Sequence, residues 1–170
     1  MCRWKPRPHR KSAHLIYFPH MIFRRAFTIL EALIVVAVFG LLATLAILSL
    51  NSARASMRDA QRLSDVSTMR AGLSQYWFEK ATYPIAESIS VGQPGANKFS
   101  SAGFVDQTDT ATPVYIQTLS PGPKANEFYR YRGSANGYSL RFKTETRTEL
   151  GLPNVYYAHS TGIDGEDTDK

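Results

Sequence analysis

Cysteine is almost absent from this chain of 170 residues, and the only one, Cys2, lies next to the N-terminus. The rest of the sequence therefore has no thiol for a disulfide, for nucleophilic catalysis or for metal binding. Histidine is similarly scarce, because three of the four histidines precede Phe27 and only His159 follows it. Beyond the first 26 residues, sites built on Cys and His clusters are excluded, and a folded domain must be held by its apolar core.

Acidic residues are absent from the first 26 residues, which hold seven basic ones: Arg3, Lys5, Arg7, Arg10, Lys11, Arg24 and Arg25. These seven leave thirteen of the twenty Lys and Arg for the rest of the chain, against all fourteen Asp and Glu. The formal charge of +6 therefore belongs to the N-terminal segment, and the remainder has a net charge of −1. This distribution removes the sequence-wide argument for a nucleic-acid partner that a basic pI would otherwise support.

Proline is absent from Phe27 to Thr82, and the first part of this stretch, residues 27–50, reads FTILEALIVVAVFGLLATLAILSL. At about 1.5 Å per residue, a helix of this length spans roughly 36 Å, enough to cross a hydrocarbon core of about 30 Å. Arg24 and Arg25 stand directly before it, and no comparable basic pair follows. The positive-inside rule then predicts a single-pass helix with its N-terminus in the cytoplasm and the rest of the chain outside.

Glu31 is the one charged residue inside the apolar run, and it separates three interpretations. A secretory signal peptide, cleaved at the small residues Ala53-Arg54-Ala55, normally has an apolar core of only about 7–15 residues. A plain anchor for an extracytoplasmic binding domain accounts for everything except Glu31, because a carboxylate in a spanning helix costs about 2.5–3.5 kcal/mol. The third interpretation gives this carboxylate a task.

Residues 24–40, RRAFTILEALIVVAVFG, resemble the processing motif of type IV pilins and pseudopilins. In that family a basic leader ends in a small residue, usually Gly, followed by Phe, Thr, two aliphatic residues and Glu. Here Ala26 replaces the Gly and precedes Phe27. The resemblance implies that a prepilin peptidase cleaves between Ala26 and Phe27 and methylates the new amine. It also implies that Glu31 pairs with the charged N-terminus of a neighbouring subunit and sets the register of assembly.

The function implied by this resemblance is that of a structural, non-enzymatic subunit of a type IV pilus, a type II secretion pseudopilus or a DNA-uptake filament. The implied partners are prepilin peptidase, other pilin-like subunits, and an assembly platform with ATPase-driven machinery at the cytoplasmic membrane. Met21 would begin a short leader of the family's usual kind, so that residues 1–20 are an extension or a misassigned start. Gly40 interrupts the apolar run, either for close helix packing or as a point of local unwinding, because Gly disfavours helix by about 1 kcal/mol.

The helical pattern continues beyond Leu50, with an apolar stripe at spacings of three, four or seven formed by Met57, Leu63, Val66, Leu73, Tyr76 and Trp77. Charged residues are expected on the other faces: Arg54, Arg58, Asp59, Arg62, Asp65 and Arg70. We expect one helix from about Phe27 to Lys80, with residues 51–82 packed on a domain formed by residues 83–170. Tyr83-Pro84 would end it, and two helices with a break near Asn51-Ser52 are the alternative.

The expected fold class is α+β, a long helix laid on a small antiparallel sheet. Residues 85–112 are rich in Gly, Ser, Asn and Thr, which predicts irregular structure with a short helical turn or two, and residues 113–119 form a short apolar element. The clearest strand signal is residues 127–145, where two alternating runs flank Asn136-Gly137, a typical hairpin turn. A two-residue loop there would pair Tyr131 with Phe142, and residues 154–160 would add a third strand.

The same register would place Arg132 opposite Arg141 and Arg130 opposite Lys143 on the solvent face, where like charges are mildly destabilising. These four side chains are either a cationic patch for an acidic partner or solvated groups neutralised by nearby acids: Glu127, Glu145 or Glu149. The acidic partner would be DNA, an anionic polymer or the next subunit.

The C-terminal tail concentrates four acids: Asp164, Glu166, Asp167 and Asp169. Oxygen ligands at such spacing suit calcium, although no complete loop signature is matched, and a solvated acidic terminus is the alternative. No other cofactor is expected. His159 lies in an apolar run and is predicted to be a packed strand residue. Because the sequence beyond the leader has no paired metal ligands and no phosphate-binding Gly loop, it predicts no enzyme activity.

Overall fold

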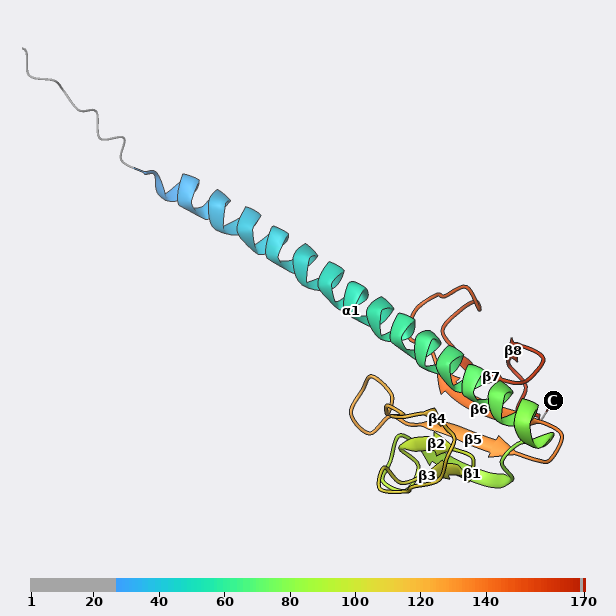
Figure 1. Cartoon of the computed structure of the whole chain (residues 1–170). Helices are drawn as coiled ribbons and strands as arrows, with labels where there is room; N and C mark the ends of the chain where they lie inside the picture. Colours follow the sequence, from blue (N-terminus) through green and yellow to red (C-terminus); the bar gives the residue numbers. More distant parts are fainter. Residues whose placement is uncertain (1–26, 169) are drawn as a thin grey trace, which may run out of the picture. The chain divides into compact units, whose positions relative to one another are not determined.

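The computed structural model describes residues 27–168 and 170 (Figure 1). The chain divides into two compact units, one ending at Leu41 and the other comprising Leu42–Lys170, and the boundary falls within the single helix α1. The helices and strands are α1 (Ile29–Lys80), β1 (Ala86–Val91), β2 (Lys98–Ser100), β3 (Gly103–Val105), β4 (Val114–Ile116), β5 (Tyr129–Gly133), β6 (Tyr138–Lys143), β7 (Val155–Ala158) and β8 (Ile163–Asp164). The predicted α+β class is confirmed, and α1 has no break near Asn51-Ser52.

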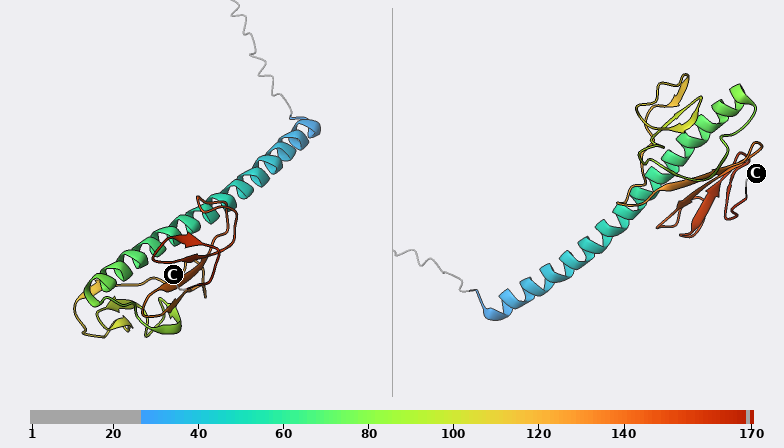
Figure 2. Two further views of the ribbon diagram at one scale, coloured as in Figure 1. Left: turned by 90° about the vertical axis from the view of Figure 1, so that its right-hand side faces the viewer. Right: turned by 90° about the horizontal axis from the view of Figure 1, so that it is seen from below.

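The strands of the second unit form two antiparallel sheets. The larger sheet has the order β1-β5-β6-β7-β8, and the smaller one has the order β3-β2-β4. The part of α1 that belongs to this unit lies against the strands, as both views in Figure 2 show. The sheets and this part of the helix enclose one hydrophobic core. This core holds in place the helix and strands that carry the charged groups described below.

One face of α1 is buried against both sheets, at Asp59, Arg62, Val66, Met69, Gly72 and Leu73. A Cβ atom on Gly72 would lie only 2.7 Å from Ile116 Cδ1, so the missing side chain lets β4 approach the helix. Met57 was predicted to lie in the apolar stripe, but its side chain is 71% exposed. The buried face therefore follows the spacing 59-62-66-69-73, which includes two charged residues and leaves Met57 outside it.

Aromatic side chains connect the two sheets. Phe99 on β2 packs on Phe104 with ring centroids 4.7 Å apart, and Phe104 packs on Tyr131 of β5 at 4.6 Å. The contacts continue from Tyr131 to Tyr138 at 6.1 Å and from Tyr138 to Tyr83 at 4.9 Å. Pairs of this kind contribute roughly 0.5–1.5 kcal/mol beyond their buried area, so this chain of rings supplies much of the core's cohesion.

The expectation for residues 85–112 was wrong. Residues 85–112 were expected to be irregular, but they contain β1, β2 and β3. β1 pairs with β5, more than thirty residues further along the chain, so a non-local ladder overrides weak local propensity. The stretch at residues 113–119 contains the strand β4, and the predicted third strand at residues 154–160 contains β7.

The hairpin of β5 and β6 has the predicted strands but a different register. Its loop has four residues, Ser134 to Gly137, closed by a hydrogen bond from the Ser134 N–H to the Gly137 carbonyl at 2.9 Å. Tyr131 therefore lies opposite Leu140 instead of Phe142. Because the shift is two residues, every side chain stays on its predicted face, and Tyr131, Leu140 and Phe142 are all buried.

Candidate functional site

The apolar part of α1 buries none of its side chains against the rest of the described chain. Every residue from Phe27 to Leu50 is exposed, and the large apolar side chains of this stretch are 40–83% exposed. By length and composition the helix is able to cross a membrane. An apolar surface of this size requires a lipid or protein environment, since soluble monomers seldom expose contiguous apolar patches beyond a few hundred Å².

The first turn of α1 places the one acid of the apolar run. Thr28 precedes the helix, and its Oγ1 accepts a hydrogen bond from the Glu31 N–H at 3.2 Å. The spacing Thr-x-x-Glu is that of a capping box, which favours a helix start at this point. Among the described residues, no hydrogen bond or ion pair is made by the Glu31 carboxylate. The backbone of Glu31 therefore helps to start the helix, while its charge has no partner in the described part of the chain.

The other residues of the predicted processing and assembly segment lie on either side of Glu31. Phe27 is 69% exposed at the start of the described chain, and Ala26 lies outside the described residues. A Cβ atom on Gly40 would meet no atom within 4 Å, so packing within the chain gives no steric reason for a glycine there. Any steric requirement for Gly40 must therefore arise in contact with another molecule.

The predicted cationic patch lies on the face of β5 and β6 that points away from the core, but its pairing differs from the prediction. Arg130 lies opposite Arg141, and Arg132 lies opposite Ser139 instead of Arg141. Lys143 is on the same face of β6 and is exposed. Of the acids expected to neutralise this patch, Glu127 and Glu145 bind Arg62 instead. Arg132 forms an ion pair with Asp167 at 3.3 Å.

Three of the four acids of the C-terminal tail are engaged with side chains of the same chain, and the fourth, Asp169, lies outside the described residues. The Lys170 ammonium lies 3.1 Å from Asp164 and 2.7 Å from Glu166, and the Asp167 carboxylate accepts a hydrogen bond from Ser139 at 2.8 Å. The backbone N–H of Glu166 and the Lys170 ammonium lower the pKa of Asp164 to about 2. Within residues 27–168 and 170, no group of three or more His, Cys, Asp or Glu side chains is arranged to hold a metal ion.

His159 is buried directly after β7 and anchors the start of the tail. Its Nδ1 lies 3.1 Å from the Tyr138 carbonyl, and its Nε2 lies 3.1 Å from both Asp164 Oδ1 and the Glu166 carbonyl. Both ring nitrogens are therefore used within the chain. The predicted packing of His159 is confirmed, but the residue lies one position beyond the strand instead of within it.

A buried ionic cluster joins α1 to the larger sheet, and the sequence reasoning missed it. Arg62, only 1% exposed, binds three carboxylates: Asp59 at 2.6 Å, Glu127 at 2.7 Å and Glu145 at 2.6 Å. Arg58 and Lys124 contact Glu145 from the outside, both at 2.7 Å. The signal that could have found this cluster is the spacing of Asp59 and Arg62, which is in phase with the buried positions Val66, Met69 and Leu73.

Asp59 also closes the end of the β5–β6 hairpin. Its carboxylate accepts the backbone N–H groups of Glu145 and Thr146 at 2.7–3.0 Å and the Thr146 hydroxyl at 2.7 Å. Burial alone would raise the pKa of Asp59, but these hydrogen bonds and the one from Arg62 lower it. The hydrogen bond from Arg58 is the main cause that lowers the pKa of Glu145, and Lys124 and Arg62 add to it against the effect of burial.

These lowered pKa values predict acid sensitivity of the second unit. The folded state keeps Glu145 and Asp59 charged at pH values where the unfolded chain already binds protons, because their ordinary values are 4.5 and 3.8. Their contribution is complete above about pH 4.5 and is lost as the pH falls through the lowered pKa values. We expect the free energy of unfolding, measured by urea titration, to decrease as the pH is lowered below about 4.5.

Two variants test the origin of this acid sensitivity. Glu145→Gln should flatten the decrease, because one of the responsible carboxyl groups no longer titrates. Glu149→Gln removes an exposed acid four residues further along and should leave the pH dependence as in the wild type. An unchanged decrease in Glu145→Gln would show that other groups cause it.

In three comparisons with known proteins, no protein-family model, no curated protein and no solved structure matches the chain.

Proposed function

We propose that this chain is a structural subunit of a type IV pilus-like or pseudopilus-like filament, cleaved between Ala26 and Phe27 and assembled through the apolar part of α1. The observation that carries the proposal is Glu31, whose carboxylate has no partner among the described residues although it lies in an otherwise apolar, exposed helix. A charge at such a position is costly unless something outside the chain pairs with it.

Cleavage before Phe27 would supply that partner. It creates an amine at the start of the helix, four residues from Glu31, and a neighbouring subunit would present the same amine to the same helix end. An ion pair between two subunits in an apolar environment fixes their relative register, because a shifted neighbour leaves both charges unpaired. The resemblance of residues 24–40 to the pilin processing motif supports this assignment.

The remaining exposed apolar surface fits the same function. Before assembly the helix would lie in the cytoplasmic membrane, with the N-terminus inside and residues 51–170 outside, as the basic pair before it favours. After extraction by an ATPase-driven assembly platform, the same side chains would pack against the helices of other subunits. The glycine at position 40 would then serve either close helix packing or local unwinding.

The cleavage site is tested by expressing the full chain, tagged at its C-terminus, together with a prepilin peptidase. Wild type should become shorter by the leader, and Ala26→Leu should remain at full length because the small side chain before the cleaved bond is lost. Ala53→Leu is the matched control, since it alters the small-residue site that a signal peptidase would use. Processing that is blocked by Ala53→Leu and unaffected by Ala26→Leu would overturn the proposal in favour of a signal peptide.

A further inference from the structure

The outer face of the larger sheet places positively charged side chains next to each other. Side chains alternate along β5 and β6, which places Arg130, Arg132, Arg141 and Lys143 on the face opposite the core. Arg130 and Arg141 are direct cross-strand partners and both are exposed. Among the described residues, neither guanidinium group makes an ion pair or a hydrogen bond. Like charges at directly opposed positions are destabilising, so the sheet keeps an arrangement that folding alone disfavours.

The chain's own acidic tail occupies the neighbouring part of this face. Ser139 points outward on β6, yet it is 1% exposed because the tail lies over it. The Asp167 carboxylate accepts a hydrogen bond from Ser139 Oγ at 2.8 Å, and the Asp167 carbonyl accepts one from Arg132 Nη2 at 2.7 Å. This end of the face therefore already binds an acidic peptide segment, through both its carboxylate and its backbone.

Two cavities that share Arg130 and Arg141 lie along the cationic face, and the smaller one includes this contact. The first, of about 240 Å³, has Asp167 in its wall together with Arg130 and Arg141, and Tyr157 and Glu87 also line it. The second, of about 410 Å³, lies on the other side of the two arginines and reaches Lys143 at the end of the hairpin.

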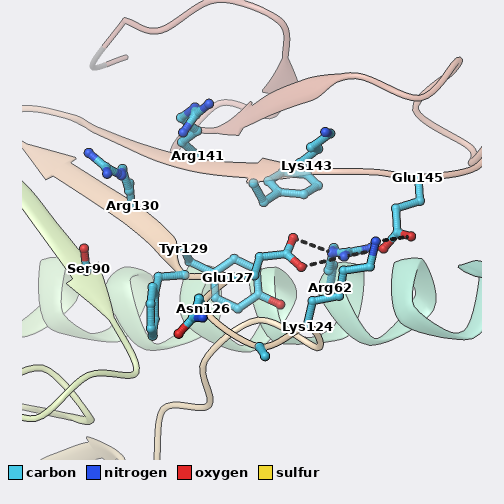
Figure 3. Close-up of a pocket in the computed structure, with 13 residues that line it drawn as sticks. Arg62, Ser90, Lys124, Asn126, Glu127, Tyr129, Arg130, Arg141, Lys143 and Glu145 are labelled. Atoms are coloured by element: carbon cyan, nitrogen blue, oxygen red, sulfur yellow. Dashed lines mark hydrogen bonds and ion pairs between the residues drawn. The ribbon is translucent and has the colours of Figure 1, made fainter.

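Figure 3 shows how charges are divided around the larger cavity. Arg130, Arg141 and Lys143 project from the strands on the side away from α1. The carboxylates in the same wall, Glu127 and Glu145, point the other way and bind Arg62. The surface between the tail and Lys143, called the lane below, is therefore lined by three cations. Two of the carboxylates beside it, Glu127 and Glu145, are already bound to Arg62.

We propose that this lane on the outer face of β5 and β6 binds an acidic peptide segment of a partner protein, beside the chain's own tail. The guanidinium groups of Arg130 and Arg141 present forked donors that suit carboxylates, and Lys143 adds a point charge. The chain's own C-terminal tail is an acidic segment of this kind. Its Asp167 occupies Arg132 at one end of the lane and would compete with the partner's peptide for that side chain. This site does not depend on filament formation.

A peptide fits these observations better than a nucleic acid does. The chain from Phe27 onward has a net charge of −1 and gives no polyanion a favourable long-range field. This counts most against a nucleic acid, whose affinity depends on neutralising many closely spaced phosphates. The wall of the smaller cavity also contains Glu87 and Asp167, which a phosphate backbone would have to pass. A flexible acidic segment can adjust its conformation so that its carboxylates contact the arginines and avoid these two acids.

Binding is measured with the full chain in detergent micelles and a fluorescein-labelled peptide of alternating Asp and Gly, by fluorescence anisotropy. The double variant Arg130→Gln/Arg141→Gln should raise the Kd about tenfold, the sum of two exposed ion pairs. Lys80→Gln/Arg147→Gln removes two exposed cations elsewhere and should leave the Kd unchanged. Asp167→Asn should lower the Kd because it removes the negative charge that lies 3.3 Å from Arg132 and repels an incoming carboxylate, whereas Glu149→Gln, with the same change of charge, should not.

Three results would overturn the proposal: no binding of the Asp peptide, equal binding of a version with Asn for Asp, or equal Kd values for the two double variants. Duplex DNA serves as the competing probe in the same assay. If DNA binds with the Arg130/Arg141 dependence and the peptide does not, the face is a nucleic-acid site and the assignment to an acidic peptide is wrong.

Discussion

Replacing Arg62 by Met is expected to lower the free energy of unfolding by about 3–5 kcal/mol, the usual cost of removing one partner from a buried ionic cluster. Methionine fills a similar volume but leaves Asp59, Glu127 and Glu145 close together with no central cation. Asp59 is itself 1% exposed, so water cannot replace the lost guanidinium. The contact between α1 and the open end of the β5–β6 hairpin should weaken most, because Arg62 on the helix binds Glu127 and Glu145, which flank the two strands there.

The effect is measured by urea unfolding of the full chain in detergent, in a Trp4→Phe background so that the tryptophan fluorescence comes from Trp77 alone. This side chain is stacked on Tyr83 with ring centroids 4.7 Å apart, so it reports on the packing of the helix end. Arg54→Met is the matched control, because Arg54 is exposed on the same helix, and its substitution should change the stability by less than about 0.5 kcal/mol. Equal losses in the two variants, or a loss below about 1 kcal/mol for Arg62→Met, would contradict the proposed role of the cluster.

Replacing Glu31 by Ala or Gln is expected to leave membrane insertion and cleavage intact but to exclude the subunit from filaments. Without the carboxylate, the amine of a neighbouring Phe27 would be buried unpaired, at a cost of about 3–5 kcal/mol. A penalty of this size lowers incorporation by about a hundredfold or more, measured as the ratio of subunit in sheared filaments to subunit in the membrane.

Thr28→Ala separates the charge of Glu31 from its place in the first turn. It removes the Oγ1 that accepts the Glu31 N–H, which costs about 1 kcal/mol of helix stability, but it keeps the carboxylate. Glu31→Gln does the reverse, since it keeps the backbone N–H and the side-chain length. We expect assembly to survive Thr28→Ala and to fail in Glu31→Gln. Assembly at wild-type level in Glu31→Gln would show that the charge of Glu31 is not needed for assembly.

The sequence predicted those parts of the fold that depend on neighbouring residues. An uninterrupted apolar run followed by helical spacing, with Pro84 as the stop, gave α1 to within two residues of its observed ends. Strict alternation gave the faces of β5 and β6 correctly even though the loop length was wrong, because a shift of two residues preserves the side of every side chain.

The parts that sequence reasoning missed depend on partners far along the chain. β1 is a strand because β5 offers it a ladder, and nothing within residues 85–91 requires this. Arg62 reads as a surface residue until Glu127 and Glu145, more than sixty residues away, are seen to enclose it. For the candidate sites, the motif around Glu31 is contiguous and could be identified directly, whereas the docking of the tail on Ser139 required the fold.

The mass of the N-terminal peptide, determined on protein isolated from the membranes of its own cells, tests the central claim most directly. The account predicts a peptide that begins at Phe27 and carries one methyl group on its amine. A peptide beginning at Met1 or Met21 would indicate an uncleaved anchor, and one beginning at Ser56 would indicate a cleaved signal peptide. Either result would contradict the assignment of this chain to a filament.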